Sequence, residues 1–339
     1  MSETSPTCVI IGPTKSGKTS LLGILQLATA KVAEQQGLSL RMQPSSPDMV
    51  DLIEFSNSPE NLGQLPSTLD VKRYIFDYEV THQNRDRVFQ KNFHTRFSMI
   101  DSPGEALLGD RKDWTNKEKM EKARVELLSE LKTANFIVLC ADSTDSASII
   151  QFIRFLPRAL SETGLRRLPC EKLVICLTKA DKYVVEHPNL TTVDQFIYED
   201  PKQCVDRVIG TEALSMLRWY LREDAEIRAG WASVYGFDPE TGRANYDGVT
   251  DGLLIDGSAG RTPATILQHW QPFRIVEPFV FLTAGLSMNL KEIPPLGAHL
   301  AGIRQPRIFD SLSNRSRGVG SFFRKMRLLM SAFYDYIKF

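Results

Sequence analysis

One stretch near the start of the chain, GPTKSGKT at residues 12–19, limits the possible folds more than any other feature. It fits the pattern G-x-x-x-x-G-K-[ST] at every fixed position. The apolar run CVIIG at residues 8–12 precedes it, and residues 18–36 carry apolar side chains at helical spacing. We therefore predict a strand that turns into a helix through a glycine-rich loop, which is how many α/β domains begin.

The loop has the chemistry of a phosphate-binding site. Gly12 and Gly17 let the backbone curl so that its N–H groups surround phosphate oxygens, and the following helix adds its positive N-terminal end. Lys18 would reach the β- and γ-phosphates, and the Thr19 hydroxyl would ligate Mg²⁺. The other loop positions that we expect to contact phosphate are Thr14, Lys15, Ser16 and Ser20. The alternative is a glycine-rich turn that binds nothing.

The rest of the chain alternates short apolar runs with helical patterns. We expect further strands at residues 71–80, 93–101, 136–141, 173–177 and 231–235, and helices at 118–133, 149–160 and 205–220. The first two of these strands flank the polar turn THQNRD, which favours an antiparallel pair. The later strands are apolar on both faces, so we predict a mostly parallel sheet covered by helices.

Composition excludes several classes of protein. The 339 residues hold 41 Lys and Arg against 41 Asp and Glu, and a general nucleic-acid binder should be strongly basic. No apolar run approaches the ~18–20 residues that span a bilayer, and the polar start MSETSPT does not resemble a secretory signal. Five scattered cysteines without metal-ligand spacing predict a reduced, cytoplasmic protein without a structural metal.

A second candidate motif is DSPG at residues 101–104, at the end of the predicted antiparallel pair. A carboxylate at a strand end is suited to a further Mg²⁺ contact, so Asp101 is a candidate metal ligand. Gly104 would let a backbone N–H approach a γ-phosphate. Alone, this short pattern is weak, and the alternative is an ordinary Asp-Ser-Pro-Gly turn.

A third candidate motif is TKAD at residues 178–181, directly after the buried run LVICL. The Asp181 carboxylate could accept two N–H bonds from the edge of guanine, and the aliphatic stem of Lys179 could pack on the base. Adenine offers no such pair of donors. The alternative is a charged loop at a strand end.

The order GPTKSGKT, DSPG, TKAD resembles the P-loop GTPases of the translation-factor and Ras-like (TRAFAC) class, over about residues 7–240. The resemblance implies a doubly wound sheet, GTP or GDP bound with Mg²⁺, and two switch loops. The long loop 105–117 and the insert 183–200 favour a larger, bacterial-type member.

The same resemblance implies two further roles. Thr68 is our candidate for the first-switch Mg²⁺ ligand, with a capping threonine as the alternative. Ser233 matches a small loop beneath the base. Two positions depart from the pattern, because Thr178 replaces a usual Asn and Glu105 replaces a usual water-positioning Gln.

Lys15 carries the most specific of these hypotheses. In potassium-dependent relatives this position holds an Asn that binds the ion, so a Lys could place its own ammonium there and offset charge that develops as the bond breaks. The alternative is a solvated lysine that only raises affinity for a polyanion.

The last part of the chain differs in charge. Residues 289–339 hold nine Lys or Arg and three Asp or Glu, hence +6, which leaves −6 for residues 1–288. Residues 322–337 predict a basic amphipathic helix that could lie on a membrane or in a partner's groove. The alternative is a helix packed on its own domain. The ending YIKF lacks cysteine, so we expect no prenylation.

Three functions fit these observations. The first is a cytoplasmic GTPase, slow without a partner, that switches between GTP and GDP states, assisted by Lys18, Lys15, Gly104 and Glu105. We expect protein partners or self-association, no nucleic acid, and a peripheral membrane contact only through the tail. The second is an assembly or adaptor subunit that holds GTP with little or no turnover, which Glu105 favours. The third, an ATPase or kinase, is disfavoured by TKAD.

Overall fold

The computed structural model describes residues 5–36, 39–57, 71–82, 91–101, 116–187, 189–190, 192–247, 252–253 and 270–294. The chain divides after Ile293 into two units, and every described helix and strand belongs to the first. The predicted helix at residues 322–337 lies outside the described residues.

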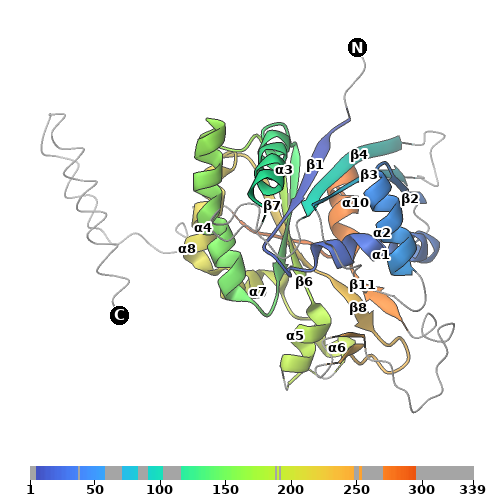
Figure 1. Cartoon of the computed structure of the whole chain (residues 1–339). Coiled ribbons are helices and arrows are strands. Elements are labelled where there is room, and N and C mark those ends of the chain that lie inside the picture. Colours follow the sequence, from blue (N-terminus) through green and yellow to red (C-terminus); the bar gives the residue numbers. More distant parts are fainter. Residues whose placement is uncertain are drawn as a thin grey trace, which may run out of the picture. The chain divides into compact units, whose positions relative to one another are not determined.

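An eight-stranded sheet forms the centre of this unit (Figure 1), in the order β12-β7-β6-β5-β1-β4-β3-β2. Its strands are β1 Thr7–Ile11, β2 Ser39–Pro44, β3 Lys72–His82, β4 Lys91–Asp101, β5 Phe136–Asp142, β6 Lys172–Thr178, β7 Glu226–Trp231 and β12 Lys291–Glu292. The five strands from β7 to β4 pair in parallel, and β3, β2 and β12 pair antiparallel. The carboxyl ends of all five parallel strands therefore meet along one edge of the sheet.

Helices cover both faces of the sheet because successive side chains of each buried strand point to opposite sides. In β1, Cys8 and Ile10 face one apolar core, and Val9 and Ile11 face the other. The helices α1 Lys18–Gln36, α2 Pro47–Asn57 and α10 Glu277–Ala284 contribute to the first core. The helices α3 Lys117–Leu131, α4 Ser146–Thr163, α5 Ala180–Glu186, α6 Val193–Phe196, α7 Pro201–Val208 and α8 Gly210–Tyr220 contribute to the second.

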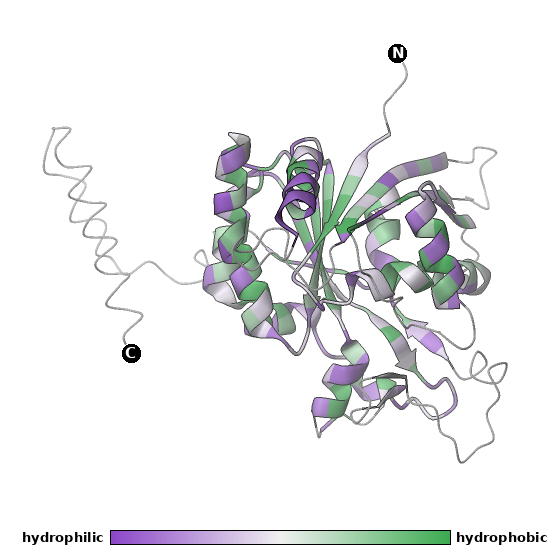
Figure 2. Ribbon diagram, viewed as in Figure 1, coloured by the Kyte–Doolittle hydropathy of each residue, from purple (hydrophilic) through white to green (hydrophobic). Residues whose placement is uncertain are grey.

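Hydropathy follows these layers. Figure 2 shows hydrophobic colours along the central strands and mixed colours on the outer helices. The helix α10 is mostly apolar and buried from Glu277 to Thr283, with the Phe279 ring 5.1 Å from that of Phe97 on β4. A helix of this composition can only be a core element. Among the described helices, none is both long and apolar enough to cross a membrane.

Two short pairs of strands lie outside the main sheet. The strand β8, Ser233–Phe237, pairs antiparallel with β11, Gln271–Phe273, and β9, Tyr246–Asp247, pairs with β10, Gly252–Leu253. We call β8 and β11 together the β8–β11 ribbon.

The predicted α/β fold, with a mostly parallel sheet and helices on both faces, is confirmed. Two details differ. The helix predicted at 205–220 is two helices, because Gly210 between them has a φ of 76°, which interrupts the helical path. The strand predicted at 231–235 spans the end of β7 and the start of β8. The sheet also extends to β12, beyond residue 288.

Candidate nucleotide-binding site

The loop between β1 and α1 has a tightly curled backbone. A Cβ atom on Gly12 would lie 2.4 Å from the carbonyl oxygen of Cys140 on β5, so any side chain there would force the loop away from the sheet. Gly17 and Lys15 both have positive φ, 77° and 62°. A curled loop of this kind, entering a helix N-terminus, suits a phosphate.

Two polar side chains at the start of α1 face the end of β4. The Lys18 ammonium donates to the carbonyl oxygens of Gly12 and Pro13, at 3.1 and 2.7 Å. Burial lowers the pKa of Lys18, and the nearby Asp101 carboxylate opposes this. The Thr19 hydroxyl donates to the Asp101 carboxylate at 2.5 Å. A hydroxyl and a carboxylate oxygen at this spacing suit Mg²⁺, which prefers oxygen ligands, so these residues fit the metal that the resemblance implies.

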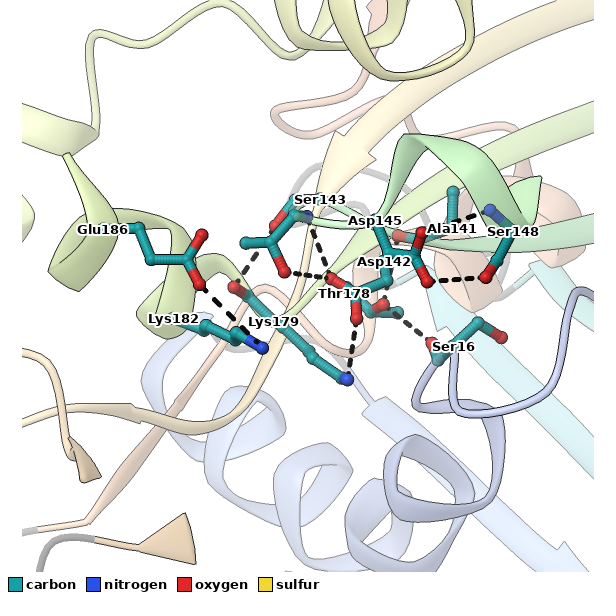
Figure 3. A network of polar contacts seen from close by, with 11 residues as sticks. Ser16, Ala141, Asp142, Ser143, Asp145, Ser148, Thr178, Lys179, Lys182 and Glu186 are labelled. Carbon is teal, nitrogen blue, oxygen red and sulfur yellow. Dashed lines mark hydrogen bonds and ion pairs between the residues drawn. The ribbon is translucent and has the colours of Figure 1, made fainter. Parts of the chain in front are cut away.

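The loop after β6 is connected to the loop after β1. The Thr178 hydroxyl lies 2.7 Å from the carbonyl oxygen of Ser16 and 3.0 Å from that of Ala141 (Figure 3). A Cβ on Gly17 would lie 3.4 Å from the Thr178 side chain, so the two loops are in close contact. Thr178 therefore links two motifs that are far apart in the sequence, by a hydrogen bond and by packing.

Lys179 is held in a fixed position. Its φ is 57°, and its ammonium lies 2.7 Å from the Asp142 carboxylate at the end of β5 (Figure 3). The Ser143 hydroxyl donates to the Lys179 carbonyl at 3.2 Å. These two contacts fix the position of the Lys179 side chain.

Asp181 is buried, with 2% of its surface exposed. Its Oδ2 atom has no hydrogen-bond partner among the described residues. Burial raises the pKa of Asp181 to about 6, although a hydrogen bond from Ser233 opposes the shift. A buried carboxylate oxygen without a donor is costly, and a ligand that supplies N–H groups would relieve it.

The phosphate loop and the TKAD loop meet at one pocket of about 280 Å³. Its polar lining comes from both loops and includes Lys15, Gly17, Ser20, Thr178, Lys179, Asp181 and Lys182. Its apolar lining comes from Leu21, Ala232, Val234, Tyr235, Tyr246 and Ile275. A charged rim with an apolar and aromatic wall suits a flat, polar-edged ring attached to an anion.

Several predicted residues do not line this pocket, among them Gly12, Lys18, Thr19 and Asp101. Ser16 is buried beneath the phosphate loop, and its Oγ has no hydrogen-bond partner among the described residues. Thr14 is half-buried in the loop. Ser233 is buried and accepts a hydrogen bond from the Gly236 amide at 2.8 Å. Thr68, Gly104 and Glu105 lie outside the described residues.

Several residues of the site were not predicted from the sequence. Asp142 directly follows the apolar run FIVLCA, so its place at a strand's carboxyl end was a usable signal. Tyr235, Tyr246 and Ile275 gave no such signal, because they reach the pocket through the β8–β11 ribbon, β9 and the turn after β11.

No protein-family model and no curated protein matches the chain. Among solved structures it is similar to the signal recognition particle receptor SRb-GTP/SRX complex from Chaetomium thermophilum, at 14% identity and a TM-score of 0.33, over 70% of this chain and 94% of that one.

It is also similar to a GTP-binding protein from Sulfolobus solfataricus in complex with GDP, at 17% identity and a TM-score of 0.28, over 68% of this chain and 47% of that one. A mutation variant of SsGBP is similar at 18% identity and a TM-score of 0.30, over 68% of this chain and 50% of that one. The chain thus spans about half the length of these two. At such scores, any functional assignment has to rest on the geometry of the site itself.

Proposed function

We propose that the chain binds GTP and GDP together with Mg²⁺, hydrolyses GTP to GDP and phosphate, and switches conformation between the two states. One observation carries this proposal. The phosphate loop and the TKAD loop, more than 150 residues apart, are joined through the bond from Thr178 to Ser16 and line one pocket.

Selectivity for guanine rests on Asp181. Its unpartnered Oδ2 can accept N–H bonds from the Watson–Crick edge of guanine, whereas adenine presents no matching pair of donors. The Lys179 stem, oriented by Asp142, would pack on one side of the base. Tyr235, Tyr246 and Ile275 supply further apolar surface to the pocket.

The phosphate end of the site rests on Lys18, Thr19 and Asp101. Lys18 would exchange its two loop carbonyl partners for phosphate oxygens, which are stronger acceptors because they are charged. Thr19 and Asp101 would hold Mg²⁺ directly or through water. When bound, this ion neutralises negative charge on the β- and γ-phosphates.

The base motif is tested by Asp181→Asn. We expect the variant to lose affinity for GTP and gain affinity for xanthosine triphosphate, because the Asn amide can donate to the extra oxygen of xanthine. Fluorescence titration with labelled nucleotides measures both affinities. Equal affinity of the parent protein for GTP and ATP would contradict the assignment.

A second function, an adaptor that holds GTP without turnover, is favoured by Glu105. A carboxylate at the position of a water-positioning Gln would repel the γ-phosphate. Single-turnover hydrolysis separates the two functions, since an adaptor would leave bound GTP intact. Thr68, Gly104 and Glu105 remain proposed switch residues.

We further propose that residues 289–339 include an appended basic segment that contacts a protein partner, a second copy of the chain or an anionic membrane surface. Its support is the charge of +6 in the sequence. Deletion of residues 318–339 tests this proposal separately from nucleotide binding.

A further inference from the structure

A second pocket, of about 310 Å³, shares the β8–β11 ribbon with the nucleotide pocket. The nucleotide pocket uses Val234 and Tyr235 of β8, whereas the second pocket uses Phe237 at the end of β8 and Phe273 of β11. The two pockets have no lining residue in common. The volume is at the lower end of the range of small-molecule sites, roughly 300–1,000 Å³.

The second pocket contains a carboxylate that is not satisfied. Glu277, on the first turn of α10, has only 4% of its side chain exposed. Its Oε1 atom accepts a hydrogen bond from Asn289 at 2.6 Å, and its Oε2 atom has no hydrogen-bond partner among the described residues. Burial raises the pKa of Glu277 to about 7, against the opposing effects of Asn289 and Arg274. Such an oxygen is stabilised by a ligand that donates a hydrogen bond.

The same pocket contains a cation, Arg274, whose ion pair with Glu277 is long. The Arg274 side chain is 12% exposed, and its Nε atom lies 3.8 Å from Glu277 Oε1, which is too long for a hydrogen bond. The guanidinium lies over the Phe273 ring, 4.8 Å from its centre. Burial lowers the pKa of Arg274, which indicates that the charged form is poorly solvated. A partly buried guanidinium in this state is stabilised by an anionic acceptor that approaches within hydrogen-bond distance.

Backbone strain independently marks this pocket. In the described residues, four non-glycine positions have positive φ, a conformation that ordinary side chains rarely adopt. Lys15 and Lys179 line the nucleotide pocket, and Arg274 and Met288, with φ of 52° and 44°, line the second. Strained positions of this kind concentrate at functional sites.

From this geometry we propose that the second pocket binds a free α-amino acid with an apolar side chain. The ammonium of the ligand donates to Glu277 Oε2, and its carboxylate accepts from the Arg274 guanidinium. Phe237, Phe273 and Met288 offer an apolar surface for its side chain. The site needs both charges of the ligand, so a ligand that lacks either charge binds less well.

The probe is L-leucine, titrated calorimetrically into the full chain, with N-acetyl-L-leucine and L-leucinamide as comparisons. N-acetyl-leucine has no ammonium and leucinamide has no carboxylate. We expect both to bind at least about tenfold more weakly than leucine, which is the loss expected for one charge-assisted hydrogen bond. Equal binding of all three, or no heat with leucine, would overturn the proposal.

Two variants assign each charge to its residue. Glu277→Gln should weaken leucine binding about tenfold but leave N-acetyl-leucine unchanged. Arg274→Asn should weaken leucine binding similarly but leave leucinamide unchanged, and Asn tolerates positive φ. Glu292→Gln, at a carboxylate 61% exposed on β12, is the control and should not alter leucine binding.

The variant Asp181→Asn tests whether leucine binds in the nucleotide pocket instead. Leucine affinity should be unchanged in this variant, whether or not guanine nucleotides bind to the parent protein. A loss of leucine binding in Asp181→Asn would place the ligand in the nucleotide pocket and overturn the proposal.

Discussion

The buried carboxylate of Asp181 should destabilise the empty protein at neutral pH. Its pKa rises from an ordinary value of 3.8 to about 6, because burial disfavours the charged form. Between these two values the folded chain binds more protons than the unfolded chain, so the free energy of unfolding falls as pH rises. At ~1.4 kcal/mol per pKa unit, the full effect is about 3 kcal/mol above pH 6.

Asp181→Asn removes this titration while keeping the shape of the side chain. We therefore expect the nucleotide-free variant to gain stability over the parent as pH rises, by about 2 kcal/mol between about pH 4.5 and about pH 7.5. Urea unfolding of both proteins across this range measures the difference. Glu277, whose pKa is about 7, titrates in both proteins and cancels in the comparison.

A constant difference in stability across the pH range would refute the reasoning, because it would mean that Asp181 titrates alike in the folded and unfolded chains. Saturating GDP with Mg²⁺ should reverse the order of stability at neutral pH, because only the parent holds the guanine edge. The residue would then stabilise the complex and destabilise the empty protein.

Three further predictions follow from the site and the tail. Gly12→Ala should abolish nucleotide binding, since its Cβ would lie 2.4 Å from the Cys140 carbonyl; normal affinity of a folded variant, measured by fluorescence titration, would contradict the loop geometry. Lys15→Ala should lower turnover more than affinity, and Lys15→Asn should respond to potassium where the parent does not; a rise in Michaelis constant alone would indicate a solvated lysine. Deletion of residues 318–339 should leave GDP affinity intact and reduce sedimentation with anionic vesicles or a partner, whereas an unfolded product would indicate a packed helix.

Much of the central sheet was predictable because its signals are local. The strands β1, β5 and β6 are continuous apolar runs, and the motifs follow directly where these runs end. The break at Gly210 was not predictable, because apolar residues at helical spacing continue across it at Val205, Ile209 and Ala213. Such a pattern predicts one continuous helix.

The second pocket gave no sequence signal. Arg274 and Glu277 are ordinary charged residues in the sequence. Only the fold brings them into one pocket with Phe237, which belongs to an earlier strand. Asp142 is an intermediate case, because its strand was predicted but its ion pair with Lys179 depends on the register of β5 with β6.

The two edges of the main sheet limit how the chain can associate. An edge strand exposes unpaired backbone groups that can recruit a strand from another molecule and start aggregation. Here β2 exposes the charged Arg41 and ends at Pro44, which lacks a backbone donor, and β12 is only two residues long, with Lys291 and Glu292 both exposed. Neither edge is a good template for further strand addition, so we expect the nucleotide-free protein to resist fibril formation at high concentration.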